Sequence, residues 1–164
     1  MKSIKLLLMS MILFSSFASQ AQKDSAEKKF RLGLGLGLGL STESSQVGIA
    51  SAELQGEYQA AKQISLFGSL GYNRLFAFSG GGSAGYGSLL VGPRGYLSTK
   101  FFVGVGAGLA YFVYSGGSSG VFNYNPHIGY NAETAQYTLG YSGLSNRGEN
   151  IGFIQLKAII KFNH

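Results

Sequence analysis

Five leucines alternate with four glycines in the stretch LGLGLGLGL, which runs from Leu32 to Leu40. A period of two places every leucine on one face of a β-strand and every glycine on the other. A helix would spread the leucines around its axis, and each interior glycine would cost about 0.5–1 kcal/mol relative to alanine. Bulky apolar side chains on one face and none on the other indicate a strand between an oily exterior and a crowded interior. This is typical of a lipid-embedded barrel.

The first 21 residues have the organisation of a cleavable signal peptide. Lys2 and Lys5 form a basic start, residues 6–17 are mostly apolar, and Ser19 and Ala21 are small residues at positions −3 and −1 of a cleavage site. The apolar run is too short for a spanning helix, and its Ser, Ala and Gln ending argues against the alternative, an uncleaved anchor. We expect 1–21 to be a signal peptide, 22–28 a flexible periplasmic leader, and 29–164 a single barrel domain.

The composition narrows the class of protein further. The chain has no cysteine, which excludes disulfides, a thiolate metal site and a lipidated N-terminal cysteine. Its formal net charge of +6 is not clustered into a patch, so we expect no nucleic-acid partner. After the signal peptide no long apolar run appears, yet the chain is 45% hydrophobic with 26 Gly, 10 Tyr and 12 Phe. This combination favours a transmembrane β-barrel.

An alternative is a soluble ligand-binding barrel in the periplasm. Such a barrel would turn its apolar residues inward and carry a charged outer face. Only 12% of the residues are charged, which argues against it.

Eight segments with a period of two follow one another along the chain. Their predicted bounds are 30–40, 47–58, 64–73, 88–97, 101–113, 122–130, 136–142 and 151–162. These lengths approach the roughly 9–11 residues that a tilted spanning strand needs. Pro93 cannot donate to a ladder, so we expect a local bulge there. The predicted fold class is all-β: an eight-stranded antiparallel up-and-down transmembrane β-barrel, preceded by the signal peptide.

The predicted connections alternate in length. Those at 60–63, 98–100 and 131–135 are tight, those at 76–86, 114–120 and 143–150 are longer and rich in Gly and Ser, and 42–46 is intermediate. Short turns on one rim and long loops on the other are typical of outer-membrane barrels. An even number of strands leaves both termini at the short-turn, periplasmic rim.

The period of two also predicts which polar side chains point into the barrel. The charged ones are Glu53, Glu57, Arg94, Lys157 and Lys161, and the uncharged polar ones are Gln55, Gln155 and His127. An eight-stranded barrel is just wide enough for side chains to fill it, and unpaired charges in it are costly. We therefore expect a hydrogen-bonded ion network that plugs the lumen. A gated or leaky ion path is the alternative.

Glycines dominate the inward faces of segments 30–40 and 101–113, which an eight-membered ring places on opposite walls. We infer that they leave room for the long inward side chains of the other strands. The alternative is that they line a small cavity.

Aromatic residues gather near the ends of the predicted strands. Near the short-turn rim are Phe30, Tyr58, Phe101, Tyr130, Tyr137 and Phe162, and near the other rim are Tyr72, Tyr111 and Tyr124. Two aromatic girdles at the headgroup levels are the membrane interpretation. The alternative is the ordinary preference of aromatic residues for strands.

Candidates for catalysis are few. His127 is the one possible general base apart from His164, and its neighbours Asn125 and Asn123 are not acids. The sequence therefore predicts no enzyme, although a lipid-modifying activity is a third alternative. A formal G-x-G-x-x-G at 80–85 precedes a predicted strand rather than the required helix, so it indicates a loop. No acidic cluster suits a metal ion, and no cofactor is expected.

Four stretches carry a resemblance to a known family. LFGSLGYNRLF (66–76), LLVGPRGYLSTKFFVGVGAGLAYF (89–112), NYNPHIGY (123–130) and IQLKAIIKF (154–162) are similar to the small, porin-like outer-membrane β-barrel domain family of Gram-negative bacteria. The resemblance implies an outer-membrane location and an envelope or surface-interaction role. The family's terminal aromatic residue would correspond to Phe162, although Asn163 and His164 follow it.

The same resemblance suggests partners for the chain. They are outer-membrane lipid, lipopolysaccharide and, during insertion, the barrel-assembly machinery, with the protein a monomer. Arg74 and Arg147, near the predicted outer rim, are weak candidates for contact with lipopolysaccharide phosphates. A narrow porin-like pore is the alternative function.

Overall fold

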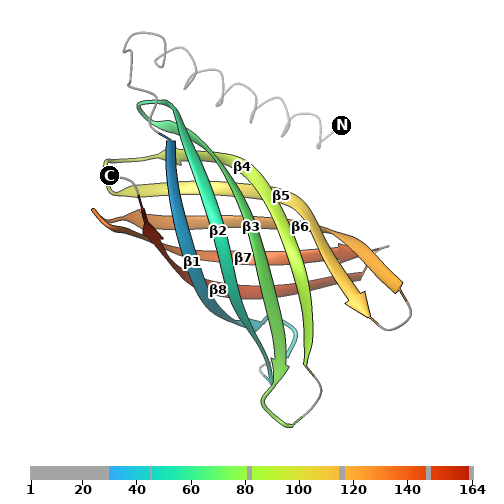
Figure 1. The fold of residues 1–164 in the computed structure, drawn as a ribbon. Coiled ribbons are helices and arrows are strands. Elements are labelled where there is room, and N and C mark those ends of the chain that lie inside the picture. Colours follow the sequence, from blue (N-terminus) through green and yellow to red (C-terminus); the bar gives the residue numbers. More distant parts are fainter. Residues whose placement is uncertain (1–29, 45, 81–82, 115–116, 147–148, 163–164) are drawn as a thin grey trace, which may run out of the picture.

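The computed structural model describes residues 30–44, 46–80, 83–114, 117–146 and 149–162. The predicted signal peptide and leader lie outside these residues. The described part forms eight strands (Figure 1): β1 (Phe30–Ser41), β2 (Val47–Ala61), β3 (Ile64–Ala77), β4 (Ala84–Tyr96), β5 (Phe101–Tyr114), β6 (Gly117–Asn131), β7 (Ala135–Asn146) and β8 (Glu149–Lys161). It contains no helix long and apolar enough to cross a bilayer.

Each strand pairs antiparallel with the next, and β8 pairs with β1, so the sheet closes into a barrel. The predicted order of eight antiparallel strands is confirmed. In Figure 1 the start of β1 and the end of β8 lie at the same rim, here called the terminal rim. The two ends share a rim because the number of strands is even.

The register gives the barrel a definite stagger. Residues on neighbouring strands are paired. The series of pairs that starts at Leu32 on β1 passes once around the barrel and ends at Gly152 on β8. The carbonyl of Gly152 accepts a hydrogen bond from the backbone of Thr42 at 2.9 Å, ten residues beyond the starting point. This stagger tilts the strands, and tilts of about 35–45° are usual for such barrels.

The observed strands are longer than predicted at the rim opposite the termini. The connections there are 42–46, 78–83, 115–116 and 147–148, while those at the terminal rim are 62–63, 97–100 and 132–134. The predicted long loops at 114–120 and 143–150 are therefore wrong, whereas the loop predicted at 76–86 remains the longest connection, at 78–83. Ser118 pairs with Val113, and Ser145 pairs with Asn150. Small residues that look like loop formers still supply the backbone groups that a ladder requires.

The predicted bulge at Pro93 is also wrong, because the register around it does not shift. Instead, the pairing with β5 is interrupted at Gly92 and Pro93 and then resumes unchanged. The pairing of β6 with β7 is interrupted in the same way at Asn125 and Pro126. There the Asn125 side-chain amide donates to the Tyr141 carbonyl at 3.0 Å, which replaces the N–H that Pro126 lacks.

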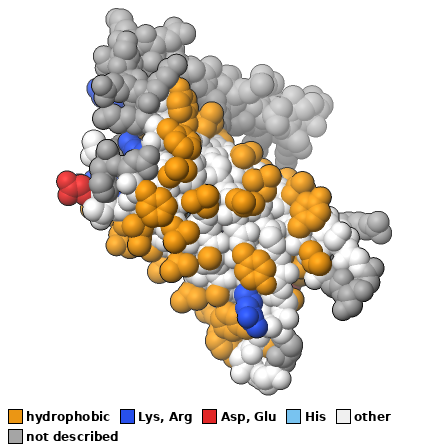
Figure 2. Space-filling view, in the orientation of Figure 1, with side chains coloured by type: hydrophobic (Ala, Val, Ile, Leu, Met, Phe, Trp, Pro, Cys, Tyr) orange, Lys and Arg blue, Asp and Glu red, His pale blue; other side chains and the backbone are white. Residues whose placement is uncertain are grey.

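The orientation of the β1 alternation agrees with expectation. Leu36 and Leu38 are 63% and 67% exposed, whereas Gly35 and Gly37 are buried. Large apolar side chains are exposed on all eight strands, and Figure 2 shows those on one side of the barrel. So many exposed large apolar side chains are unusual for a water-soluble monomer, and they suit contact with lipid.

The inward glycines make room for neighbouring side chains, as inferred from the sequence. A Cβ added at Gly37 would lie 2.5 Å from the Ser51 hydroxyl oxygen and 2.7 Å from Cγ of Lys157. On the opposite wall, a Cβ at Gly104 would lie 2.6 Å from Nε2 of His127. Long side chains thus occupy the space that these glycines leave.

The lumen also contains an apolar layer that the polar, inward-facing pattern of the sequence did not predict. Six buried residues pack together in it, near the rim opposite the termini: Ile49, Tyr86, Ala110, Val121, Leu144 and Phe153. Each of the six stands at an inward-facing position in the alternation of its strand. Buried polar residues also lie at this level, since Asn73 pairs with Tyr86 and Asn123 with Leu144. The charged side chains of the lumen lie outside the cluster.

Candidate functional site in the barrel lumen

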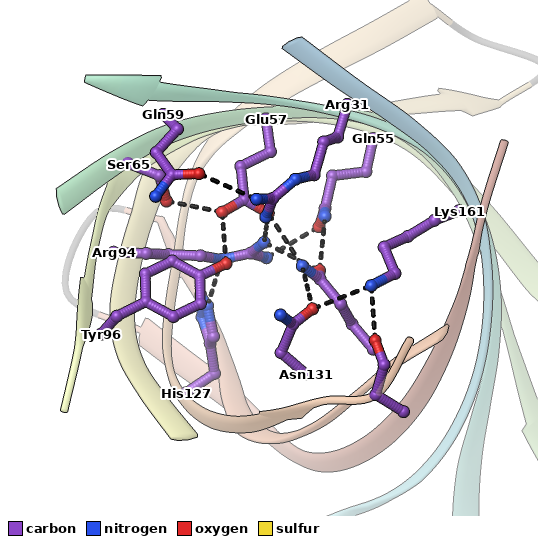
Figure 3. Close-up of polar contacts among 12 residues, drawn as sticks. Arg31, Gln55, Glu57, Gln59, Ser65, Arg94, Tyr96, His127, Asn131 and Lys161 are labelled. Carbon is purple, nitrogen blue, oxygen red and sulfur yellow. Dashed lines mark hydrogen bonds and ion pairs between the residues drawn. The ribbon is translucent and has the colours of Figure 1, made fainter. Parts of the chain in front are cut away.

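Arg94 lies at the centre of the polar side chains (Figure 3). It projects inward from β4, and only 2% of it is exposed. Its guanidinium donates to Gln55 at 2.7 Å, to Glu57 and Gln136 at 3.2 Å each, and to Nε2 of His127 at 3.1 Å. Four of its five N–H groups therefore have partners on three other strands.

Aromatic rings enclose the same guanidinium. Its central carbon lies 4.2 Å from the ring centroid of Phe67 and 4.9 Å from that of Phe102. The negative face of an aromatic ring attracts a cation, most strongly where water is absent. The His127 ring meets Phe67 edge-on, with centroids 5.3 Å apart. Arg94 is thus held by ring faces as well as by hydrogen bonds.

Glu57, on β2, is the anion that compensates Arg94. It is 3% exposed and accepts hydrogen bonds from Ser65 and Tyr96 at 2.6 Å each and from Gln136 at 2.9 Å. With Arg94, four donors surround the carboxylate, which matches its lone-pair capacity. A buried ion pair is tolerated only when its remaining hydrogen-bonding capacity is met in this way.

The other predicted lumen charges lie apart from this pair. Lys157 donates to Glu53 at 2.7 Å and forms a second ion pair. Lys161 donates to the Asn131 side chain at 3.1 Å and to the Ala132 carbonyl, near the terminal rim. The five charged residues therefore form two ion pairs and one separately bonded lysine, rather than one contiguous set of charges.

The uncharged polar residues predicted in the lumen also differ in whether they contact Arg94. Gln55 and His127 bond directly to Arg94. Gln155 points inward and is 2% exposed, but its Nε2 has no hydrogen-bond partner in the described residues. Gln155 thus stands outside the group around Arg94.

Several members of the group were not singled out from the sequence. They are Ser65, Tyr96, Asn131 and Gln136. Gln136 is 1% exposed and bonds both Arg94 and Glu57. The period of two along β7 could have identified Gln136, since it lies two residues before the inward-facing Thr138.

The surroundings of His127 offer little for catalysis. Nδ1 lies 3.1 Å from the Asn125 carbonyl oxygen, and Nε2 accepts from Arg94. Both ring nitrogens are thus used by bonds that hold the side chain in place. The described residues include no group of three His, Asp or Glu residues that could hold a metal ion.

The predicted girdle residues belong to the outward-facing set of side chains. Phe101, Tyr130 and Tyr137 are register neighbours on β5, β6 and β7, and Phe30 pairs with Tyr58. Most of these side chains are exposed or half-buried on the outside, which also holds for Tyr72, Tyr111, Tyr124 and Phe162. Their contact with lipid headgroups stays a prediction.

The closed eight-stranded sheet, the apolar outside and the polar lumen define the class of small transmembrane β-barrels. Two similar solved structures are of bacterial proteins. One is the outer membrane protein Ail of Yersinia pestis in a phospholipid bilayer nanodisc, with a TM-score of 0.56 and 15% identity over 82% of this chain and 100% of that one. The other is the N-terminal β-barrel domain of Pseudomonas aeruginosa OprF, with a TM-score of 0.57 and 14% identity over 83% of this chain and 100% of that one.

A third similar structure is a de novo designed transmembrane β-barrel. Its TM-score is 0.54 and its identity 14%, over 80% of this chain and 95% of that one. No protein-family model and no curated protein sequence matches the chain. At this level of identity the similarity establishes the fold. The resemblance to small outer-membrane β-barrels is thereby confirmed, and the predicted outer-membrane location agrees with it.

Proposed function

We propose that this chain is an integral outer-membrane β-barrel with a structural or surface-interaction role in the envelope, whose lumen is closed by polar and charged side chains. The observation that carries the proposal is the burial of Arg94 and Glu57, at 2% and 3% exposure, with partners for nearly all their polar atoms. A guanidinium held by four residues and two aromatic rings is poorly placed to move aside for a passing ion.

Two further features support a closed lumen. The apolar cluster forms a second layer between the Arg94 group and the rim opposite the termini. Beside Arg94, the cavity that contacts Glu53, Lys157 and His127 has a volume of about 10 Å³, which is close to the space of one water molecule. A continuous water column, which a pore requires, has little room here.

Conductance across a planar bilayer tests the closed lumen. We expect the refolded wild-type protein to be silent. The double variant Arg94→Ala/Phe153→Ala removes one large side chain from each layer, so it should show discrete conductance steps. Leu36→Ala, on the lipid-facing side, is the matched control and should stay silent. Heat-modifiable gel mobility verifies folding of each variant. Discrete steps from the wild type would reject the closed lumen and favour the narrow porin-like pore.

The proposal includes no enzymatic activity. His127 is bonded at both ring nitrogens, to Arg94 and to the Asn125 carbonyl, and its ring packs edge-on against Phe67 and Phe102. Cells that carry His127→Ala should therefore have the lipid A acyl pattern of cells with the wild-type protein. A changed pattern would support the lipid-modifying alternative.

The partners in this proposal are lipid and lipopolysaccharide around the barrel and the assembly machinery during insertion. Arg74 is exposed near the rim opposite the termini and donates to Ser83 at 3.0 Å, so its charge is available to a lipopolysaccharide phosphate. Arg147 lies outside the described residues. Because β1 and β8 pair, the barrel has no open sheet edge to recruit another copy, which supports a monomer.

A further inference from the structure

A cavity opens inside the terminal rim. Its volume is about 510 Å³, within the range of small-molecule sites. Its lining comes from β1, β2, β4, β6 and two turns: Arg31, Gln59, Lys62, Gln63, Tyr96, Ser98, Thr99 and Asn131. Figure 3 shows Arg31, Gln59, Tyr96 and Asn131 directed into the barrel. We call this space the mouth cavity.

The lining of the mouth cavity contains cations and no acid. Arg31 donates to the neutral side-chain amide of Gln59 at 2.8 Å. Among the described residues it has no carboxylate partner. The nearby acid Glu57 is already compensated by Arg94 and three further donors. The charge of Arg31 is therefore unneutralised by the described lining.

Hydrogen-bond donors complete the lining. The side-chain oxygen of Asn131 accepts bonds from Lys161 at 3.1 Å and from Gln136 at 3.4 Å. These two donors fix the orientation of the amide, so its NH₂ group is a donor without a partner among the described residues. The Thr99 hydroxyl likewise has no described partner. Cations and available donors around one cavity are the chemistry that recognises an oxyanion.

We propose that the mouth cavity binds a small soluble oxyanion of the phosphate class. Arg31 supplies a planar guanidinium suited to paired bonds with phosphate oxygens, and Asn131 and Thr99 supply neutral donors. Arg31, Gln59 and Asn131 all have inward parity, so the site faces the aqueous lumen rather than the lipid. This favours a soluble anion over a phospholipid headgroup. The proposal goes beyond the envelope role and is independent of whether the lumen conducts.

Titration with inorganic phosphate tests the site. The protein is refolded in a detergent without phosphate groups, and phosphate replaces chloride at constant ionic strength. NMR follows the backbone amides of Thr99 and Asn131. We expect saturable shifts at both residues. Arg31→Gln removes the charge and should weaken the apparent phosphate affinity about tenfold, which is the effect of losing one charge-assisted contact.

Lys100→Gln is the matched control. It removes one positive charge from the same rim, but Lys100 does not line the cavity, so its phosphate affinity should stay within about twofold of the wild type. Non-saturable shifts would overturn the proposal. Equal weakening by Arg31→Gln and Lys100→Gln would also overturn it, because diffuse attraction would then explain the binding.

A final experiment distinguishes free phosphate from the phosphate of a lipid headgroup. The same amides are measured in nanodiscs with and without phosphatidylglycerol. Shifts from free phosphate in the absence of the anionic lipid support a soluble ligand. Shifts that occur only with phosphatidylglycerol would replace the proposed ligand by a lipid headgroup.

Discussion

The ion pair of Glu57 and Arg94 can be examined with a double-mutant cycle. Glu57→Gln keeps the size of the side chain but leaves the Arg94 charge buried without its anion. Arg94→Met keeps an apolar chain between Phe67 and Phe102 and leaves Glu57 unpaired. The double variant removes both charges together. Because the two residues bond directly at 3.2 Å, their energetic effects should be strongly coupled.

The expected magnitude follows from the burial. Removing one partner of a buried ion pair costs about 3–5 kcal/mol, because the remaining charge stays desolvated without compensation. We therefore expect each single variant to lose about that much unfolding free energy. Independent effects would add to about 6–10 kcal/mol in the double variant. We expect it instead to be no less stable than either single variant, because it contains no unpaired buried charge.

Unfolding in urea measures these free energies. The chain contains no tryptophan, so the folded fraction is followed by heat-modifiable gel mobility and far-UV circular dichroism. Lys100→Met, a charge removal on an exposed turn, should change stability by less than about 0.5 kcal/mol. Single-variant losses below about 1 kcal/mol, or strictly additive effects, would refute the reasoning.

Three more perturbations have defined outcomes in the same unfolding assay. Leu36→Arg, in the middle of the apolar surface, should cost about 2–4 kcal/mol, whereas Leu97→Arg at the terminal rim should cost about 0–1 kcal/mol; equal losses would contradict the membrane placement. Gly37→Ala should cost about 1–3 kcal/mol through overpacking, while Gly95→Ala, with open space around it, should be close to neutral. Asn125→Ala should cost about 1–3 kcal/mol, since the partly buried Tyr141 carbonyl loses its donor; no change would show that this bond is unimportant.

Local patterns in the sequence were sufficient for the number of strands and for the direction of their side chains. The alternation from Leu32 to Leu40 defines two faces without reference to any other part of the chain. The even number of strands then places both termini at one rim. Loop lengths were not predictable in this way. Glycine and serine suggest a turn, but the backbone ladder continues through Ser118 and Ser145 because it depends on no side chain.

Which inward side chains meet was decided only by the tertiary structure. Glu57 lies 37 residues from Arg94 and 79 residues from Gln136. Their contact depends on the ten-residue stagger with which the sheet closes and on the room left by glycines on other strands. Parity along one strand is a local property of the backbone, whereas neighbours across the lumen depend on the register of all eight strands together. The sequence therefore determined that these charges point inward, and closure of the barrel determined their partners.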